Sequence, residues 1–277
     1  MPATPLLAVD GHHLLYRSWW GFTDRRIISR DKTRDLTGIF GFLAILRKTH
    51  LEAAPGHEII VAFDAEDAAA ARQASDPQYK AGRAAADHTP VKSLAMIKQG
   101  LDAAGVRWAE ISGAEGDDLL ATLAATAACQ GRPVTCYSGD RDLYQILTSD
   151  VTILTPSRRR ITAADLPGAH GVTPSQWPDY RALTGDPADN IPGITGIGPK
   201  TAAALLAGGI HLEQLRGSPR LNQPRCHAIP ARWDQLLTWR DMIRLNTRIP
   251  LPRGLTTGHP TAPMPRAAAI LDQLALW

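Results

Sequence analysis

Cysteine is scarce in this chain of 277 residues, which has only Cys129, Cys136 and Cys226. They are scattered and odd in number, so we predict core thiols in a reducing cytoplasm; a metal site would need more closely spaced ligands. No apolar run approaches the roughly 18 residues that a membrane helix needs. The opening "MPATPLLAVDGHH" also lacks the basic region of a signal peptide. We therefore expect a cytoplasmic protein that does not interact with membranes.

The composition is that of a globular protein with a slight excess of positive charge. Hydrophobic residues make up 44% and charged residues 21%, which is ordinary for a chain that buries a core. The net charge is +3 and the isoelectric point is about 8.9. This excess by itself is only a weak indication of a polyanionic partner.

Three short apolar segments end in an aspartate. They are "LLAVD", "EIIVAFD" and "PVTCYSGD", which close at Asp10, Asp64 and Asp140. Continuous apolar runs rich in β-forming residues are typical of buried parallel strands. Helical patterns lie between them, so we predict an α/β fold with a mainly parallel central sheet and helices on both faces. Ligands of such sheets bind at the carboxyl ends of the strands, where these aspartates should meet.

The character of the sequence changes after about residue 172. Short helical patterns joined by glycine- and proline-rich turns follow, and then a proline-rich tail and a last helical pattern, "AAAILDQLALW". We predict an α/β core over residues 1–172 and a smaller helical region over residues 173–277. The proline-rich tail should form an extended strap on the surface.

Acidic residues recur at the predicted ends of these elements. "AEGDDLL" opens a helix, "SGDRDLYQ" follows a strand, and "TGDPADN" precedes a glycine-rich stretch. Taken singly, each group has an ordinary alternative: acids favoured by a helix dipole, a common D-x-D pair, or a turn. Taken together, nine acids could share one edge of the sheet: Asp10, Asp64, Glu115, Asp117, Asp118, Asp140, Asp142, Asp186 and Asp189.

Crowded carboxylates repel one another, and divalent cations relieve that repulsion. Oxygen ligands select hard ions such as Mg²⁺ or Mn²⁺ over zinc, and nine acids exceed the need of one magnesium ion. The pattern therefore predicts two or three divalent ions, spaced about 4 Å apart as in sites that cleave phosphodiesters. The rest of the chain has 18 acids against 30 Lys and Arg, a charge of +12. A basic body around an acidic metal site is typical of a nuclease.

The stretch "LTGDPADNIPGITGIGPKTAAALL" has three interpretations. Its glycines approximate a nucleotide-binding P-loop, but Pro199 interrupts the motif and no strand precedes it, so we expect no nucleotide cofactor. We favour a helix–hairpin–helix motif over about residues 186–207, whose glycines form a turn with positive φ and whose second helix contacts one DNA phosphate. A plain helical hairpin is the third interpretation. The predicted DNA-binding residues are Gly193, Gly196, Gly198, Lys200 and Thr201.

In this order and spacing, the motifs resemble the 5′-nuclease (flap endonuclease) family, which includes the N-terminal domain of bacterial DNA polymerase I and its stand-alone and phage relatives. The resemblance is strongest from Leu6 to Leu206, and it implies a PIN-like core. No polymerase domain follows in the sequence, so we expect a free-standing form. The segments that carry the resemblance are "LLAVDGHHLLYR", "VAFDA", "YKAGR", "EGDDLLATLA", "SGDRDLYQ" and "DYRALTGDPADNIPGITGIGPKTA".

The resemblance assigns the acids to two metal groups. The first is Asp10, Asp64, Glu115 and Asp117, with Asp118 beside it, and the second is Asp140, Asp142, Asp186 and Asp189. The hairpin matches a duplex-holding motif that often binds a potassium ion. A departure from the family is Gly116, where relatives often have alanine, and this glycine is expected to loosen the helix start.

The segment "YKAGR" matches the base of a helical arch, about residues 79–100, that overlies the metals in this family. The resemblance implies that Lys80 and Arg83 grip the scissile phosphate and that Tyr79 stacks on a nearby base. For Tyr79, a buried core aromatic is the alternative.

These features together imply a structure-specific 5′-3′ exonuclease and flap endonuclease that acts on DNA in replication or repair. Its partner would be DNA with a 5′ flap or 5′ end, including RNA-primed DNA, and we expect a monomer. The alternatives are a PIN-type ribonuclease, which lacks the hairpin and the arch segment, and a non-catalytic module that binds branched DNA.

Overall fold

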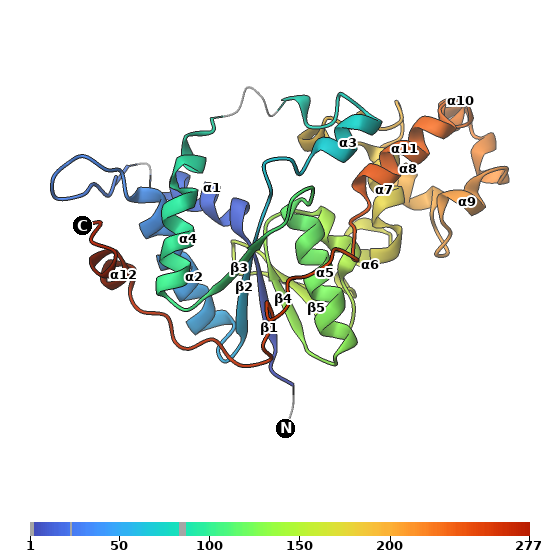
Figure 1. Ribbon diagram of the computed structural model, residues 1–277. Helices are drawn as coiled ribbons and strands as arrows, with labels where there is room; N and C mark the ends of the chain where they lie inside the picture. Colours follow the sequence, from blue (N-terminus) through green and yellow to red (C-terminus); the bar gives the residue numbers. More distant parts are fainter. Residues whose placement is uncertain (1–2, 23, 83–86) are drawn as a thin grey trace.

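The computed structural model describes residues 3–22, 24–82 and 87–277 (Figure 1). This part of the chain forms a six-stranded sheet in the order β3-β2-β1-β4-β5-β6. All neighbours pair in parallel except β6, which is antiparallel to β5. The predicted mainly parallel sheet is therefore confirmed. The strands are β1 (Leu6–Asp10), β2 (Glu58–Phe63), β3 (Arg107–Glu110), β4 (Val134–Tyr137), β5 (Val151–Leu154) and β6 (Arg160–Ile161).

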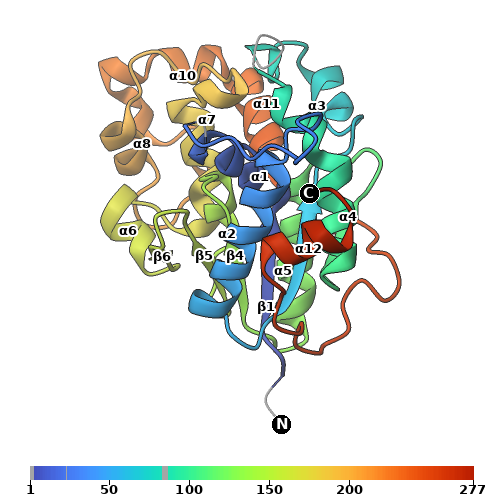
Figure 2. The same cartoon turned by 90° about the vertical axis from the view of Figure 1, so that its left-hand side faces the viewer.

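The central strands are almost entirely buried, and mostly apolar, because both faces of the sheet are covered. In β1, Leu6 and Ala8 belong to one core, and Leu7 and Val9 belong to the other. This division follows the alternation of side chains along a strand. The core that contains Leu7 is built with α1 (Gly11–Gly21), α2 (Thr37–Ala53), α4 (Leu94–Ala103) and α12 (Ala267–Gln273), and α5 (Gly116–Cys129) covers the opposite face (Figures 1 and 2).

A set of short helices extends the core on the α5 side. In Figure 1 they lie beyond α5, near the end of the sheet at which β1 and β2 finish. Among them, α7 packs against α8 and α11. These helices are α6 (Asp165–His170), α7 (Trp177–Thr184), α8 (Pro199–Leu205), α9 (Leu212–Leu215), α10 (Ala228–Ala231) and α11 (Trp233–Ile243). No helix in the described ranges has the length and hydropathy needed to cross a bilayer.

Two segments lie on the chain between β2 and α4. They are the short helix α3 (Ala70–Ser75) and the 3₁₀ turn Thr89–Ser93 that leads into α4. In Figure 1 they stand on opposite sides of the carboxyl end of the sheet. Residues 83–86, within the predicted arch, lie outside the described residues, and Arg83 is one of them.

The C-terminal tail returns to the α/β core. Residues 244–266 contain no helix or strand, in agreement with an extended strap. The strap crosses the amino end of β2, where Thr257 N and Oγ1 donate to Glu58 Oε1 at 2.5 and 2.7 Å, and Ile59 N donates to Thr261 Oγ1 at 2.8 Å. The helix α12 then packs against α2 and α4. These contacts join the tail to the first part of the chain.

Replacing Glu58 with Ala is expected to destabilise the protein by about 3 kcal/mol, because it strands a buried arginine. Glu58 is 2% exposed, and its Oε2 accepts from Arg132 at 2.6 Å. The surface pair of Glu52 and Arg158 is the matched control, since both side chains are about half exposed and such pairs contribute roughly 0–1 kcal/mol. Urea unfolding of E58A and E52A measures the difference, and equal losses would mean that the buried contacts of Glu58 do not stabilise the fold.

Candidate active site

Four of the predicted acids line one cleft at the carboxyl edge of the sheet. Asp10 is the last residue of β1, Asp64 follows β2, Asp140 follows β4, and Asp117 is in the first turn of α5. The strand order reverses at β1, which lies between β2 and β4, and such switch points are where α/β sheets bind ligands. The four carboxylates line a cavity of about 990 Å³.

A buried serine connects two of these acids. Ser138 Oγ donates to Asp10 Oδ2 at 2.7 Å and accepts from Asp140 N at 3.0 Å. Asp10 Oδ1 also accepts from His13 N at 2.8 Å, which caps α1. Asp140 Oδ1 in turn accepts from Asp142 N at 2.7 Å. These bonds hold the ends of β1 and β4 at a defined separation.

On the other side of Asp10, Asp64 is positioned by a histidine and a glycine. Asp64 N donates to His12 Nδ1 at 3.1 Å, and Asp64 Oδ1 accepts from Gly116 N at 2.5 Å. A Cβ at position 116 would lie 2.9 Å from Asp64 Oδ1. The glycine that departs from the family pattern therefore allows the start of α5 to approach Asp64 closely.

The crowding of these acids shows in their pKa values. Burial raises the pKa of Asp10 to about 7, and the charges of Asp64 and Asp140 add to the effect. The pKa of Asp117 is raised well above its usual value by burial and then by Asp140, Asp10 and Asp64. Because these groups resist ionisation, the cleft favours a cation among them.

Arg72, whose side chain is mostly buried, holds two further acids outside the cleft. Arg72 Nη1 and Nη2 each donate to one oxygen of Asp118 at 2.8 Å, and Nη1 lies 3.0 Å from Glu115 Oε1. Asp118 Oδ1 also accepts from Asn246 N at 2.8 Å. Metal binding by Asp118 would require release of this arginine.

Arg181 likewise contacts two acids of the second predicted metal group. It forms an ion pair with Asp186, and its Nε lies 3.7 Å from Asp142 Oδ1. Burial, followed by Asp140 and Asp186, raises the pKa of Asp142 to about 8. The charge of Asp189, which is 8% exposed, also contributes to this shift.

The carboxylate oxygens of these acids are suitable ligands for hard divalent cations, although they do not converge on a single metal position. Across residues 3–22, 24–82 and 87–277, no three His, Cys, Asp or Glu side chains converge closely enough to hold one metal ion in this conformation. Two observations favour a cation here: the raised pKa values, and Asp142 Oδ1, which is buried and has no hydrogen-bond partner among the residues that the structure describes. Oxygen donors of this kind select ions such as Mg²⁺.

The predicted arch residues begin beside this cleft. Lys80 lines it and pairs with Glu115, and Lys80 N donates to Asp189 O at 3.1 Å. Lys80 has φ 55°, a left-handed conformation that is uncommon for a residue with a side chain. Tyr79 is 3% exposed, and its hydroxyl donates to Glu115 at 3.2 Å. Stacking of Tyr79 on a base would require it to leave this buried position.

The glycine-rich stretch forms two turns between α7 and α8. Backbone hydrogen bonds of 2.7 and 2.8 Å close the turn over residues 186–191. The flanking Gly185 and Gly193 both have positive φ, and a Cβ on Gly193 would lie 2.4 Å from Gly185 N. Gly196 has φ 84°, as predicted, but Gly198 has φ −92° because it is the extended N-cap of α8, so the expectation of positive φ was wrong there.

The two remaining predicted hairpin residues follow on α8. Lys200 is exposed, and Thr201 is half-buried. Both line a small cavity of about 110 Å³ together with Arg225. These residues are therefore accessible to a ligand along the surface.

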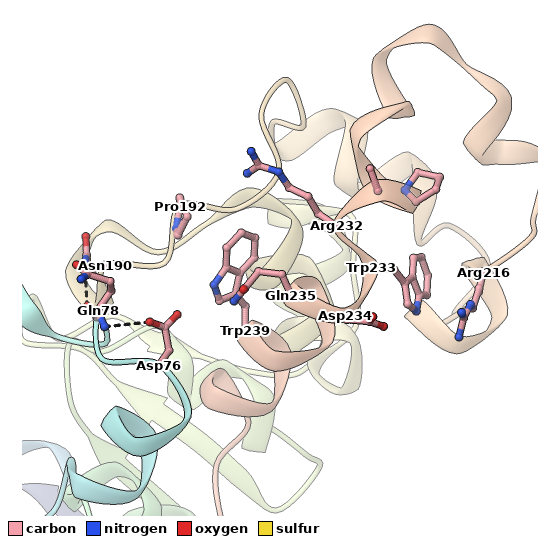
Figure 3. A pocket seen from close by; sticks show the side chains of 12 residues that line it. Asp76, Gln78, Asn190, Pro192, Arg216, Arg232, Trp233, Asp234, Gln235 and Trp239 are labelled. Carbon is pink, nitrogen blue, oxygen red and sulfur yellow. Dashed lines mark hydrogen bonds between the residues drawn. The ribbon is translucent and has the colours of Figure 1, made fainter.

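A further cavity, of about 750 Å³, contains none of the predicted site residues. Figure 3 shows it between the segment before Tyr79, the turn at Asn190 and the helix that carries Trp239. Asn190 Nδ2 donates to Gln78 O at 2.9 Å, which joins the arch base to the turn with Asp189. The charged residues that line this cavity are of both signs: Asp76, Asp234, Arg216 and Arg232.

Sequence reasoning missed the residues that position the acids. Ser138 and Arg181 stood inside the segments "SGDRDLYQ" and "DYRALTGDPADNIPGITGIGPKTA", but no role was predicted for them, and Arg72 lies in no such segment. Asp10, the partner of Ser138, is 128 residues away in sequence. His12 and His13 stood next to Asp10 in a segment that we had singled out, and this adjacency to a strand-end acid was the available signal.

Comparison with known proteins agrees with this architecture. Residues 5–169 match the family model for the 5′-3′ exonuclease, N-terminal resolvase-like domain, and residues 172–265 match that for the 5′-3′ exonuclease, C-terminal SAM fold. A thermostable DNA polymerase I of Thermus thermophilus is 38% identical over 257 residues, which cover 90% of this chain and 30% of the relative. DNA polymerase I of Mycobacterium bovis is 36% identical over 207 residues, or 73% and 23% of the two chains. The chain thus spans about 30% of the length of the first of these relatives.

Solved structures share the fold at lower identity. T5 D15 protein, co-crystallised with metal ions, has a TM-score of 0.66 at 20% identity, with 88% of this chain and 90% of that chain covered. Human GEN1 in complex with Holliday junction DNA has a TM-score of 0.57 at 12% identity, with 99% and 67% covered. At these identities the similarity establishes the fold.

Proposed function

Because this chain belongs to the 5′-3′ exonuclease family, we propose that it hydrolyses DNA phosphodiesters at a 5′ end or 5′-flap junction. The observation that carries this proposal is the cleft at the switch point of the sheet, which is lined by Asp10, Asp64, Asp117 and Asp140. The family membership supports a nuclease, and the cleft supports a reaction that depends on divalent cations.

We propose that the cations bind among the two groups of acids named above, and that they are Mg²⁺ or Mn²⁺. When bound, they would supply a water of lowered pKa and stabilise the departing 3′-oxygen. The protein's own contribution is positioning: Ser138 sets Asp10 against Asp140, and Gly116 N orients Asp64.

Lys80 provides positive charge at the edge of this cleft. Its ion pair with Glu115 and its backbone bond to Asp189 hold it there. We propose that it offsets the charge that grows on the phosphoryl oxygens, with Arg83 as its partner from the arch. The products would carry a 5′-phosphate and a 3′-hydroxyl.

The hairpin would hold duplex DNA at a distance from the cut. Gly196 and Gly198 have open space where a Cβ would be, and Lys200 is exposed beside them. We propose that this backbone and Lys200 contact one phosphate, and that a K⁺ ion binds at the turn. The protein would act as a monomer in the cytoplasm on flap, primer or RNA-primed DNA.

One assay tests the function. The protein is incubated with a 5′-flap DNA, a single-stranded RNA and a plain duplex, in Mg²⁺, Mn²⁺ or EDTA. We expect incision of the flap DNA in either metal and none in EDTA. Metal-dependent cutting confined to RNA would indicate a PIN-type ribonuclease, and binding of the flap without cutting would indicate a non-catalytic module.

Replacing Lys200 with Ala is expected to weaken duplex binding about equally on all DNA sequences. The slope of log Kd against log salt concentration should fall by about one, because one phosphate contact is lost. Fluorescence anisotropy in EDTA measures both effects. Lys48→Ala, which removes an exposed lysine of α2, is the control. If K200A and K48A have the same slope, Lys200 does not contact a phosphate.

A further inference from the structure

A cavity of about 690 Å³ lies between the acidic cleft and the hairpin. It is bounded by α6, α7, the start of α8 and Arg141, and its lining includes His170, Trp177, Arg181 and Lys200. Its lining residue Arg141 follows Asp140, which lines the cleft, and its lining residue Lys200 is the second residue of α8, the proposed DNA-holding helix. No carboxylate lines this cavity within the described residues.

One residue of the lining, Trp177, has a buried hydrogen-bond donor without an acceptor. Trp177 is 1% exposed, and its ring packs against Tyr144, His170 and Tyr180 with centroid distances of 5.0, 4.9 and 5.3 Å. Among the described residues, Trp177 Nε1 has no hydrogen-bond partner. Buried donors are rarely left unpaired, because they lose their hydrogen bond to water and gain no other bond to offset that free energy. An acceptor from a ligand would satisfy this indole.

The charge of the cavity is positive. Arg141 is exposed, and no ion pair in the described part of the chain involves it. Arg181 is shared with Asp186 and Asp142, so its charge is partly offset. The pKa of His170 is lowered by burial and then by Arg141 and Arg181, which shows that both arginines act on this space. An anionic ligand is therefore favoured over a neutral one.

We propose that this cavity binds one backbone phosphate of duplex DNA, through the guanidinium of Arg141 and the indole N–H of Trp177. The proposal rests on the function proposed above and adds a contact between the point of incision and the hairpin. A phosphodiester supplies a negative charge that can pair with the Arg141 guanidinium. It also supplies an oxygen that can accept a hydrogen bond from Trp177 Nε1. The cavity in Figure 3 is a poorer candidate, because it is lined by two acids and two arginines.

Two substitutions test the contact by DNA binding in EDTA, where no cutting occurs. Arg141→Gln is expected to weaken duplex binding about five- to tenfold at low salt and to lower the salt slope by about one. Trp177→Phe keeps an aromatic ring but removes the donor, so we expect about threefold weaker binding with an unchanged slope. Arg253→Gln, an exposed arginine of the C-terminal strap, should change neither.

The indole itself gives an independent readout in the wild-type protein. In a ¹⁵N-¹H spectrum, the Trp177 Nε1 signal, assigned through Trp177→Phe or by its proximity to the assigned α7 backbone, should move downfield on addition of duplex DNA. Inorganic phosphate alone should move it only at much higher concentration. A shift with inorganic phosphate and normal DNA binding by R141Q would mean that the cavity takes a free phosphate, and this would overturn the proposal.

An unmoved indole signal, or an R141Q salt slope equal to that of R253Q, would also overturn it. Neither result bears on flap cutting by the wild-type protein, so failure of this contact is distinguishable from failure of the proposed function.

Discussion

Asp140→Asn is expected to lower the single-turnover rate of flap cutting by about 1,000-fold or more while DNA binding stays within about twofold of wild type. A divalent ion contributes several kcal/mol to such a reaction, and each 1.36 kcal/mol is a factor of ten in rate. Asn keeps the oxygen that accepts from Asp142 N at 2.7 Å, so the local backbone should persist. Quenched-flow cutting with excess enzyme measures the rate.

The same variant should be more stable than the wild type in EDTA. Asp140 raises the pKa values of Asp10, Asp117 and Asp142, so removal of its charge relieves repulsion among four carboxyls. An increase in Tm of about 2–4 °C corresponds to roughly 1 kcal/mol for a protein of this size. Asp272→Asn, an exposed acid on α12, is the control and should change neither rate nor Tm. A lower Tm with weaker DNA binding would instead mean that Asp140 serves the fold.

Lys80→Met is expected to lower the cutting rate at saturating enzyme by about 100-fold, the loss typical of one preorganised charge in an active site. Lys80 lines the cleft and is held by Glu115, whereas methionine keeps most of the side-chain volume without the charge. Arg72 and Tyr79 still contact Glu115 in the variant, so the acid keeps buried partners.

Lys92 offers a matched comparison for this substitution. It is exposed and lines the same cleft from the helical turn before α4. Lys92→Met should weaken DNA binding by less than about fivefold, as for one screened phosphate contact, and leave the rate at saturating enzyme unchanged. Equal losses of rate in K80M and K92M would mean that the cleft needs only general positive charge.

The strands and their terminal acids were predictable from the sequence because burial on both faces requires continuous apolar runs. "LLAVD" and "EIIVAFD" correspond to β1 and β2, and Asp10 and Asp64 stand at their ends. Parallel strands bring such residues to one edge wherever they pair. The order of the strands was not predictable, since it depends on pairings such as that of Leu6 with Val134, 128 residues apart.

The sequence by itself determined the α/β class, the acids at the strand ends and the glycine-rich hairpin, because periodicity and residue type are local properties. Only the tertiary structure decided which of the nine acids line the cleft and which are held outside it by ion pairs. Arg72 and Arg181 hold Asp118 and Asp186 away from the cleft, and Asp10, Asp64, Asp117 and Asp140 line it. In the tertiary structure, Tyr79 is also buried, and Thr257 of the C-terminal tail donates a hydrogen bond to Glu58. Each of these outcomes depends on contacts between residues far apart in the chain, for which the local pattern carries no signal.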